Sequence, residues 1–147
     1  MTRDVIVVPP ELTLDAAWRI MTRERIRHLP VVRAGALIGM LSDRDVLVHA
    51  KVGEGGVLHV PQKVLVAEAM SHVPLETCEA STSVGELAKT MTEKKIDAIP
   101  VVRGLRLVGL VTSTDLLYLL IERDEARPLP FDFRLFEDDR PYAAAEA

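Results

Sequence analysis

The fold is decided by a segment that occurs twice, as LDAAWRIMTRERIRHLPVVRAGALIGMLSDRDVL at residues 14–47 and as VGELAKTMTEKKIDAIPVVRGLRLVGLVTSTDLL at residues 84–117. The two copies align without a gap at an offset of 70 residues and are identical at eleven of 34 positions. Agreement at one fixed offset over this length indicates an internal repeat. The sequence therefore predicts two units of the same structure.

Each copy begins with elements whose types follow from the spacing of apolar residues. The short apolar runs Val5 to Val8 and Val73 to Thr77 predict a first strand in each unit. A helix follows, with apolar residues at the i, i+3, i+4, i+7 spacing that buries one face. These positions are Leu14, Ala17, Trp18 and Met21 in the first copy and Val84, Leu87, Ala88 and Met91 in the second. Thr13 is a candidate cap of the first helix, and Ser83 with Glu86 forms a capping-box pattern before the second.

A β-hairpin and a second helix complete each copy. A short β-branched run with a proline predicts a strand that either begins at the proline or lies at a sheet edge, and a tight turn leads to its hairpin partner. Ser42 and Thr112 are then positioned to cap the second helix. The expected elements are Leu29–Val32, Ala36–Leu41 and Asp43–Ala50 in the first copy, and Ile99–Val102, Arg106–Val111 and Ser113–Ile121 in the second. Two β-α-β-β-α units predict an α/β (α+β) sandwich with pseudo-twofold symmetry.

The repeat divides the chain into four parts. We expect a first repeat over residues 1–50, a linker over 51–68, a second repeat over 69–121 and an acidic tail over 122–147. The tail holds eight acidic and four basic residues, whereas residues 1–121 hold fourteen of each. All three phenylalanines of the protein, Phe131, Phe133 and Phe136, lie in this tail. Because phenylalanine is costly to leave in water, we expect part of the tail to pack against the body or a partner subunit.

Composition excludes several classes of function. Only two aromatic residues, Trp18 and Tyr118, precede the tail, and the net charge is −4, so the basic surface and stacking aromatics of nucleic-acid-binding proteins are not evident. The longest unbroken apolar run, Leu116 to Ile121, is too short for a membrane span. Cys78 is the only cysteine, which fits a reducing compartment. We expect a cytoplasmic protein that binds neither nucleic acid nor membrane.

The sequence offers no motif for catalysis or metal binding. The four histidines, His28, His49, His59 and His72, do not have the spacing of zinc ligands. No Ser-His-Asp or Cys-His arrangement indicates a nucleophile. We therefore expect no enzyme activity, no catalytic cofactor and no metal ion.

With both copies in view, the sequence resembles the CBS (cystathionine-β-synthase) domain family, in which the domain occurs in tandem pairs. The resemblance rests on the amphipathic helix, on I-x-x-[LI]-P-V-V, and on L-[IV]-G-[ML]-[LV]-[ST]-x-x-D-[VL]-L, and it covers roughly residues 1–121. It implies a cleft between the repeats that binds AMP, ADP, ATP or S-adenosylmethionine, as a regulatory sensor acting on a separate enzyme or transporter. The alternative is a ligand-free module that mediates dimerisation or partner binding.

The resemblance also implies the residues that hold the ribose. Ser42 with Asp45, and Thr112 with Asp115, match the [ST]-x-x-D motif, whose aspartate receives the ribose hydroxyls. A carboxylate can accept both O–H donors of a cis-diol in charge-assisted hydrogen bonds. The same residues also fit a structural role, in which the hydroxyls cap helices and the aspartates stabilise the first helical turns.

Candidate phosphate ligands stand just before the proline and inside the motif. The resemblance implies basic residues that face a phosphate, and the first repeat has Arg27, His28 and Arg44 there. A guanidinium group presents donors that match phosphate oxygens. Arg27 fits a solvated charge at the strand entry as well, and Arg44 fits a surface arginine of the helix. The second repeat has Asp97, Ala98 and Thr114 at the same positions. We therefore expect two unequal sites, with the ribose on Asp45 or Asp115 and the phosphates near the three basic residues.

Finally, the resemblance implies a homodimer in which two modules meet through their helices. The second helix of each repeat supports this, since it is apolar over more than one face, and a bare apolar patch tends to mark an interface. The residues concerned are Val46, Leu47 and Val48, and Leu116, Leu117, Leu119, Leu120 and Ile121.

Overall fold

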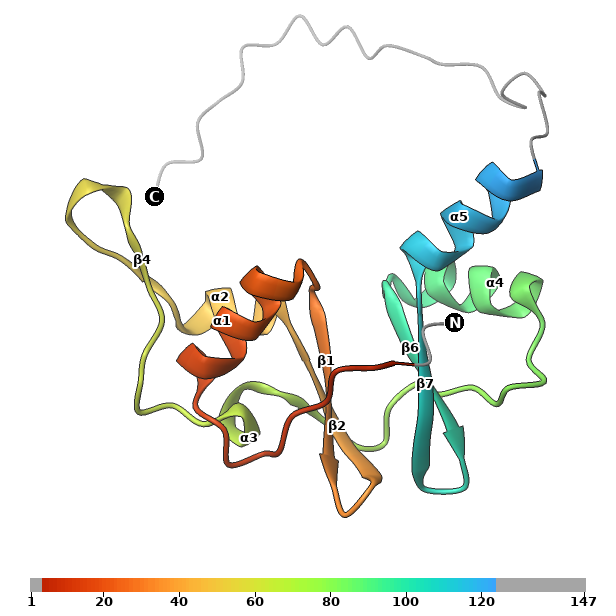
Figure 1. Cartoon of the computed structure of the whole chain (residues 1–147), viewed down its shortest axis with the longest axis horizontal. Coiled ribbons are helices and arrows are strands. Elements are labelled where there is room, and N and C mark those ends of the chain that lie inside the picture. Colours follow the sequence, from red (N-terminus) through yellow and green to blue (C-terminus); the bar gives the residue numbers. More distant parts are fainter. Residues whose placement is uncertain (1–3, 124–147) are drawn as a thin grey trace, which may run out of the picture.

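The computed structural model describes residues 4–123 and contains two similar units side by side (Figure 1). The first repeat consists of α1 (Leu14–Glu24), β1 (His28–Arg33), β2 (Ala36–Ser42) and α2 (Asp43–His49). The second consists of α4 (Val84–Lys94), β6 (Ala98–Arg103), β7 (Arg106–Thr112) and α5 (Ser113–Arg123). Between them lie β3 (Lys51–Val52), η1 (Glu54–Gly56), β4 (Leu58–His59), α3 (Val66–Ala69) and β5 (Ser71–His72). The predicted α+β class is confirmed.

One five-stranded sheet connects the two repeats. Its order is β1-β2-β7-β6, and β5 pairs with β2. Each repeat forms its own antiparallel hairpin, but β2 and β7 share the single register pair Ala36 and Arg106. The repeats are thus joined at the turn ends of their hairpins, and Ser42 and Thr112 stand at the other ends of β2 and β7.

The predicted first strands are not formed: a single bridge lies at Val8 in the first predicted run, and another lies at Cys78, one residue beyond Val73 to Thr77. Val8 forms an isolated parallel bridge with Val31, and Cys78, which is its equivalent at the 70-residue offset, forms one with Val101. The Val8 N–H donates to the Pro30 carbonyl at 3.1 Å, and the Val32 N–H donates back to Val8 at 3.0 Å. Two prolines follow Val8 and lack the N–H that a longer ladder would need. The apolar runs are therefore not full strands, which corrects the sequence-based expectation.

The helix caps and most boundaries agree with the sequence. The Thr13 hydroxyl accepts a hydrogen bond from the Ala16 N–H, and Ser83 with Glu86 forms the complete capping box. Helix α2 ends one residue earlier than predicted, at His49. Helix α5 runs to Arg123 and so includes the first two residues assigned to the tail. The tail phenylalanines lie outside the described residues.

The two repeats bury their first helices to different depths. In α1 three residues of the predicted stripe, Leu14, Ala17 and Met21, are buried, and Trp18 is partly buried. In α4 only Leu87 and Met91 are buried, whereas Val84 is 46% exposed and Ala88 is exposed, so half of that predicted stripe is wrong. The difference arises because α3 and the residues before it cover α1: the Leu14 N–H donates to the Val64 carbonyl at 2.8 Å, and the Val66 N–H donates to Leu12 at 2.8 Å.

The segment assigned to the linker carries structure of its own. Strands β3 and β4 pair as a separate two-stranded sheet, which projects from the first repeat in Figure 1. Helix α3 begins inside this segment, and its Val66 is fully buried in the core of the first repeat. The connection therefore joins the repeats and also packs into the core of the first repeat.

Candidate functional site

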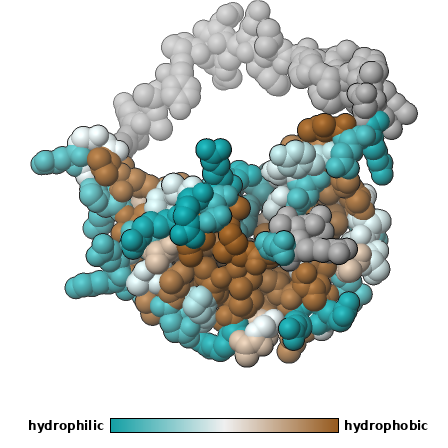
Figure 2. Space-filling model, in the orientation of Figure 1, coloured by the Kyte–Doolittle hydropathy of each residue, from teal (hydrophilic) through white to brown (hydrophobic). Residues whose placement is uncertain are grey.

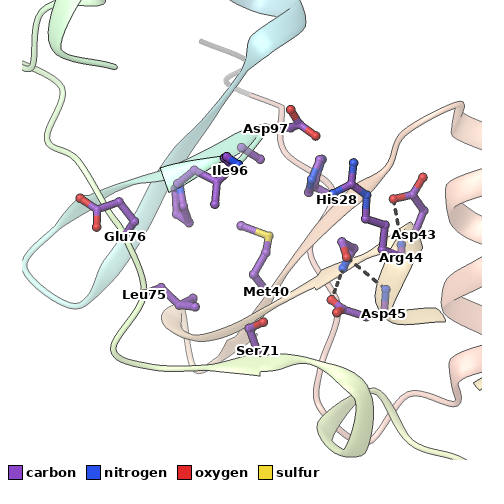
Figure 3. A pocket seen from close by; sticks show the side chains of 14 residues that line it. His28, Met40, Asp43, Arg44, Asp45, Ser71, Leu75, Glu76, Ile96 and Asp97 are labelled. Atoms are coloured by element: carbon purple, nitrogen blue, oxygen red, sulfur yellow. Dashed lines mark hydrogen bonds between the residues drawn. The ribbon is translucent and has the colours of Figure 1, made fainter. Parts of the chain in front are cut away.

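A cavity of about 230 Å³ lies between the repeats beside the Ser42–Asp45 motif, and we call it the Asp45 pocket. It combines the start of α2 with the residues just before β6 (Figure 3). In Figure 3 the side chains of Met40, Leu75 and Ile96 form an apolar part, and charged residues gather beside His28. The lining residues are His28, Met40, Ser42, Asp43, Arg44, Asp45, Ser71, Leu75, Glu76, Lys95, Ile96, Asp97, Ala98 and Pro100.

A second cavity, of about 250 Å³, lies beside Thr112, and we call it the Thr112 pocket. It combines the start of α5 with the residues just before β1 and with the amino-terminal segment. The lining residues are Asp4, Val5, Ile6, Arg25, Ile26, Arg27, His28, Leu110, Thr112 and Thr114. The two cavities are therefore related by the pseudo-twofold symmetry, because each takes the motif of one repeat and the pre-strand residues of the other.

Local hydrogen bonds hold each motif in place. The Asp45 carboxylate accepts a hydrogen bond from the Ser42 N–H at 2.8 Å, while the Ser42 hydroxyl accepts one from the Asp45 N–H at 3.2 Å. In the second repeat the Asp115 carboxylate accepts from the Thr112 N–H at 2.8 Å and from its hydroxyl at 3.1 Å. Both aspartates therefore act as partners in helix capping, which is the structural role that the sequence left open.

Backbone contacts fix the pre-strand residues against these helix starts. The Asp43 N–H donates to the Arg27 carbonyl, and the Ser113 N–H donates to the Asp97 carbonyl, both at 2.9 Å. His28 pairs in register with Ser42. Each motif is thus tied to the pre-strand residues of its own repeat, whereas the side chains of Arg27 and Asp97 line the pocket that holds the other repeat's motif.

His28 is the residue that borders both cavities. Burial, reinforced by the positive charge of Arg27, lowers the pKa of its imidazole below the ordinary value. The carboxylates of Asp43, Asp97 and Asp45 act in the opposite direction. The neutral imidazole is therefore favoured at the boundary between the pockets.

The structure separates the three basic residues that the sequence grouped together. Arg44 lines the Asp45 pocket, Arg27 lines the Thr112 pocket, and His28 lines both. Ser42 and Asp45 line the first pocket and Thr112 lines the second. Asp115 is not among the lining residues, and it reaches the second site through its hydrogen bonds to Thr112. Arg44 therefore shares a cavity with Asp45, and Arg27 shares one with Thr112, which is the pairing that the sequence left open.

The sequence analysis missed Arg25 and Lys95, which line the Thr112 and Asp45 pockets respectively. They are equivalent at the 70-residue offset, and both adopt the left-handed conformation at the end of the first helix, with φ of 55° and 53°. A signal was present, since the aligned copies keep a basic residue at this position. It was hidden because this position belongs to the helix end rather than to the recognised motif.

Two further observations concern residues 4–123. Within this range no group of three or more His, Cys, Asp or Glu side chains is arranged to hold a metal ion. None of the helices in the same range has the length and apolar character needed to cross a bilayer.

The family model described as the CBS domain matches residues 1–51 and again residues 66–122. The chain belongs to the CBS-domain family. The tandem CBS pair expected from the repeated motif is thereby confirmed, and the two repeats described above are its two CBS domains.

Several proteins resemble this CBS pair over most of its length. The protein YhcV of Bacillus subtilis, a CBS domain-containing protein, is 32% identical over 117 residues, which are 79% of this chain and 79% of YhcV. The inosine-5'-monophosphate dehydrogenase of Korarchaeum cryptofilum is 36% identical over 117 residues, but these are 79% of this chain and only 22% of the dehydrogenase. The match therefore covers only the CBS region of that enzyme and is no evidence for a dehydrogenase activity in this chain.

A solved structure shares the same arrangement. The CBS domain pair of protein MJ0100, in complex with 5'-methylthioadenosine and S-adenosyl-L-methionine, superposes with a TM-score of 0.69 and 25% identity. The superposition covers 84% of this chain and 93% of that one. The overall arrangement of the two repeats is thus shared with a pair that binds adenosine compounds.

Proposed function

We propose that this CBS pair is a regulatory module that binds an adenosine compound in the cavities between its repeats. The observation that carries the proposal is the composition of each cavity, which joins the [ST]-x-x-D motif of one repeat to the pre-strand residues of the other. A ligand in such a cavity contacts both repeats at once. Binding therefore favours one relative placement of the repeats, which is how a signal reaches a partner.

The shape and polarity of the cavities suit an adenosine. Met40, Leu75 and Ile96 offer an apolar surface for the base in the Asp45 pocket, and Val5, Ile6 and Leu110 offer one in the Thr112 pocket. Polar groups stand at the motif end of each cavity. An apolar wall with a few convergent polar groups is the usual composition of a small-molecule site.

Capping and ribose binding are compatible uses of the same aspartate. The hydrogen bonds that Asp45 and Asp115 accept from the motif backbone and hydroxyl all end on Oδ2. A carboxylate has about four lone-pair positions on two oxygens. In Asp45, which lines its pocket, Oδ1 is therefore the atom that would receive ribose hydroxyls, while Oδ2 keeps the helix start in place.

Related proteins support the choice of ligand class. MJ0100, at 25% identity, is the relative described above whose CBS pair holds 5'-methylthioadenosine and S-adenosylmethionine. By this analogy the compounds to test are AMP, ADP, ATP, S-adenosylmethionine and 5'-methylthioadenosine. The regulatory role, a separate regulated enzyme or transporter and a cytoplasmic location belong to the same proposal.

Thermal denaturation with each of these compounds tests the proposal. A ligand that binds the native state stabilises it by RT ln(1 + [L]/Kd), which is about 2.7 kcal/mol at a hundredfold excess over Kd. We expect at least one adenosine compound to raise the Tm, and guanosine analogues to serve as the control. If none raises it, the module is ligand-free and the assembly role is the better description.

Calorimetry on matched variants then assigns the ribose contact. Asp45→Asn and Asp115→Asn keep an acceptor for the capping hydrogen bond but remove the charge that strengthens bonds from ribose hydroxyls. Glu86→Ala is the control, because Glu86 plays the same capping role in α4 and lies in neither pocket. We expect at least one aspartate variant to bind the adenosine compound more weakly, while Glu86→Ala binds it as tightly as the wild type does.

We also propose that two copies associate through α2 and α5. Helix α5 buries none of its residues fully, and Leu117, Leu120 and Ile121 are 58%, 65% and 70% exposed. Figure 2 has apolar surface over α5, at the upper right of the view. On α2, Val48 is 81% exposed. Exposed apolar residues on a helix are typical of an interface, and helices of a second copy would cover them.

A further inference from the structure

The two pockets differ in charge at equivalent positions. At the 70-residue offset, Arg27 corresponds to Asp97, and Arg44 corresponds to Thr114. Each pocket takes its pre-strand residues from one repeat and its motif from the other. Arg27 and Arg44 of the first repeat therefore lie in different pockets, which the sequence alone does not show.

In the Thr112 pocket the pre-strand residues supply two guanidinium groups. Arg25 and Arg27 both line this cavity, and the motif opposite them contributes the hydroxyl of Thr114 where the other motif has a charged side chain. Among the described lining residues, Asp4 on the amino-terminal segment is the one carboxylate. The two guanidinium groups therefore outnumber this single carboxylate, and together with the Thr114 hydroxyl they are suited to a phosphate.

In the Asp45 pocket each cation has a carboxylate near it in the lining. Lys95 comes from the same pre-strand segment as Asp97, and Arg44 lies between Asp43 and Asp45 on α2. In Figure 3 Arg44 extends beside Asp43 and His28. Glu76 also lines the cavity, and Lys94 outside it pairs with this carboxylate. The described lining thus carries more carboxylates than cations, and an added phosphate would meet net repulsion.

We propose that the Thr112 pocket is the site for a phosphate-bearing adenosine compound, and that the Asp45 pocket takes an adenosine compound that carries no phosphate. This inference rests on the proposed function, since it divides the adenosine ligands between the two cavities. The module then binds two different compounds, one in each cavity, and His28 lines both cavities.

Isoleucine methyl NMR provides a reporter for each pocket. Ile26 lines the Thr112 pocket and Ile96, its equivalent at the 70-residue offset, lines the Asp45 pocket. AMP and 5'-methylthioadenosine are the probes, because they share the adenosine framework and carry a phosphate and an uncharged methylthio group, respectively, at the 5' carbon. At low occupancy we expect AMP to shift the Ile26 methyl signal first and 5'-methylthioadenosine to shift that of Ile96.

Charge-reversal variants test the cause of this division. Arg27→Asp gives the first repeat the residue of the second, and we expect it to weaken AMP binding by about 10- to 100-fold, the effect of losing a charge-assisted contact. The binding of 5'-methylthioadenosine should change less than threefold. Asp97→Arg makes the reciprocal change and should allow AMP to shift Ile96. Arg103→Asp, on an exposed residue outside both cavities, is the control for the altered net charge.

The outcomes separate this inference from the proposed function. If AMP binds but shifts Ile96 as readily as Ile26, or if Arg27→Asp weakens both probes equally, the charge division is wrong and adenosine binding stands. If neither probe shifts either methyl signal at millimolar concentration, the charge division is wrong. If, in addition, no adenosine compound raises the Tm, the proposed function fails as well. The division is supported if AMP shifts only the Ile26 methyl signal, and if this shift disappears in Arg27→Asp but persists in Arg103→Asp.

Discussion

The Asp45 carboxylate accepts a hydrogen bond from the Ser42 backbone N–H at 2.8 Å, at the junction between β2 and α2. This contact ties the candidate ribose ligand to the start of a helix. A substitution at Asp45 is therefore expected to change both stability and binding, and the two effects need separate measurements.

Asp45→Ala should lower the free energy of unfolding by about 1 kcal/mol, because it removes one half of a capping box. Asp45→Asn should lose less, since its amide oxygen can still accept the Ser42 N–H. Urea denaturation of the ligand-free protein measures both. Equal losses in the two variants would mean that charge, rather than the capping hydrogen bond, carries the contribution.

Stability should fall as the pH is lowered through the range in which histidine titrates. Burial and Arg27 lower the pKa of His28 in the folded protein, so the unfolded chain takes up the proton first as the pH falls below about 6.5. The resulting loss begins near that value and stops growing below the folded-state pKa. Unfolding free energies at pH 7.5 and 5.5 should differ less in His28→Gln than in the wild type, and a difference of the same size would refute this assignment.

The apolar surface of α5 should control association. Leu120→Lys places a charge on a residue that is 65% exposed, and we expect it to convert a homodimer into a monomer in sedimentation at micromolar concentration. Leu105→Lys is the matched control, because Leu105 is 82% exposed but lies at the β6–β7 turn. A wild-type protein that sediments only as a monomer contradicts the proposed interface.

Two glycine substitutions should have opposite effects on stability. A Cβ added at Gly39 would lie 2.5 Å from Met70 Sδ and 2.7 Å from the Ser71 carbonyl oxygen, so Gly39→Ala should destabilise the fold by about 1–3 kcal/mol. A Cβ at Gly85, in the first turn of α4, meets nothing within 4 Å. Gly85→Ala should therefore raise stability by up to about 1 kcal/mol. Thermal melts of both variants test the pair, and a stabilised Gly39→Ala would show that β5 does not approach β2 this closely.

Removal of residues 124–147 should lower the melting temperature. The first helix of the second repeat leaves Val84 and Ala88 exposed, whereas α3 covers the equivalent part of α1. Phe136 follows Val66 by the same 70 residues that separate the repeats, so the tail contains an apolar residue in the corresponding place. Truncation after residue 140 is the control and should melt like the full chain. Unchanged melting on removal of residues 124–147 would mean that the tail does not cover α4.

Much of the fold follows from local pattern. The duplicated segment, the hairpins after Pro30 and Pro100, and the caps at Thr13, Ser42 and Ser83 were predictable, because periodicity and capping involve residues close together in the chain. The depth of burial was not predictable. Val84 occupies the same helical position as Leu14, and its exposure depends on whether a distant segment covers it.

In the candidate site, too, some features follow from local sequence and others from tertiary packing. The sequence by itself determined the motif residues Ser42, Asp45, Thr112 and Asp115, since their spacing is a property of one strand-to-helix junction. Only the tertiary structure decided that Arg27 lines the cavity of Thr112 while Arg44 lines that of Asp45. The physical reason is that each cavity is closed by residues far apart in the chain, such as Arg44 with Asp97 in one and Arg27 with Thr112 in the other. Their meeting depends on how the two repeats pack against each other, and no spacing within one repeat encodes that arrangement.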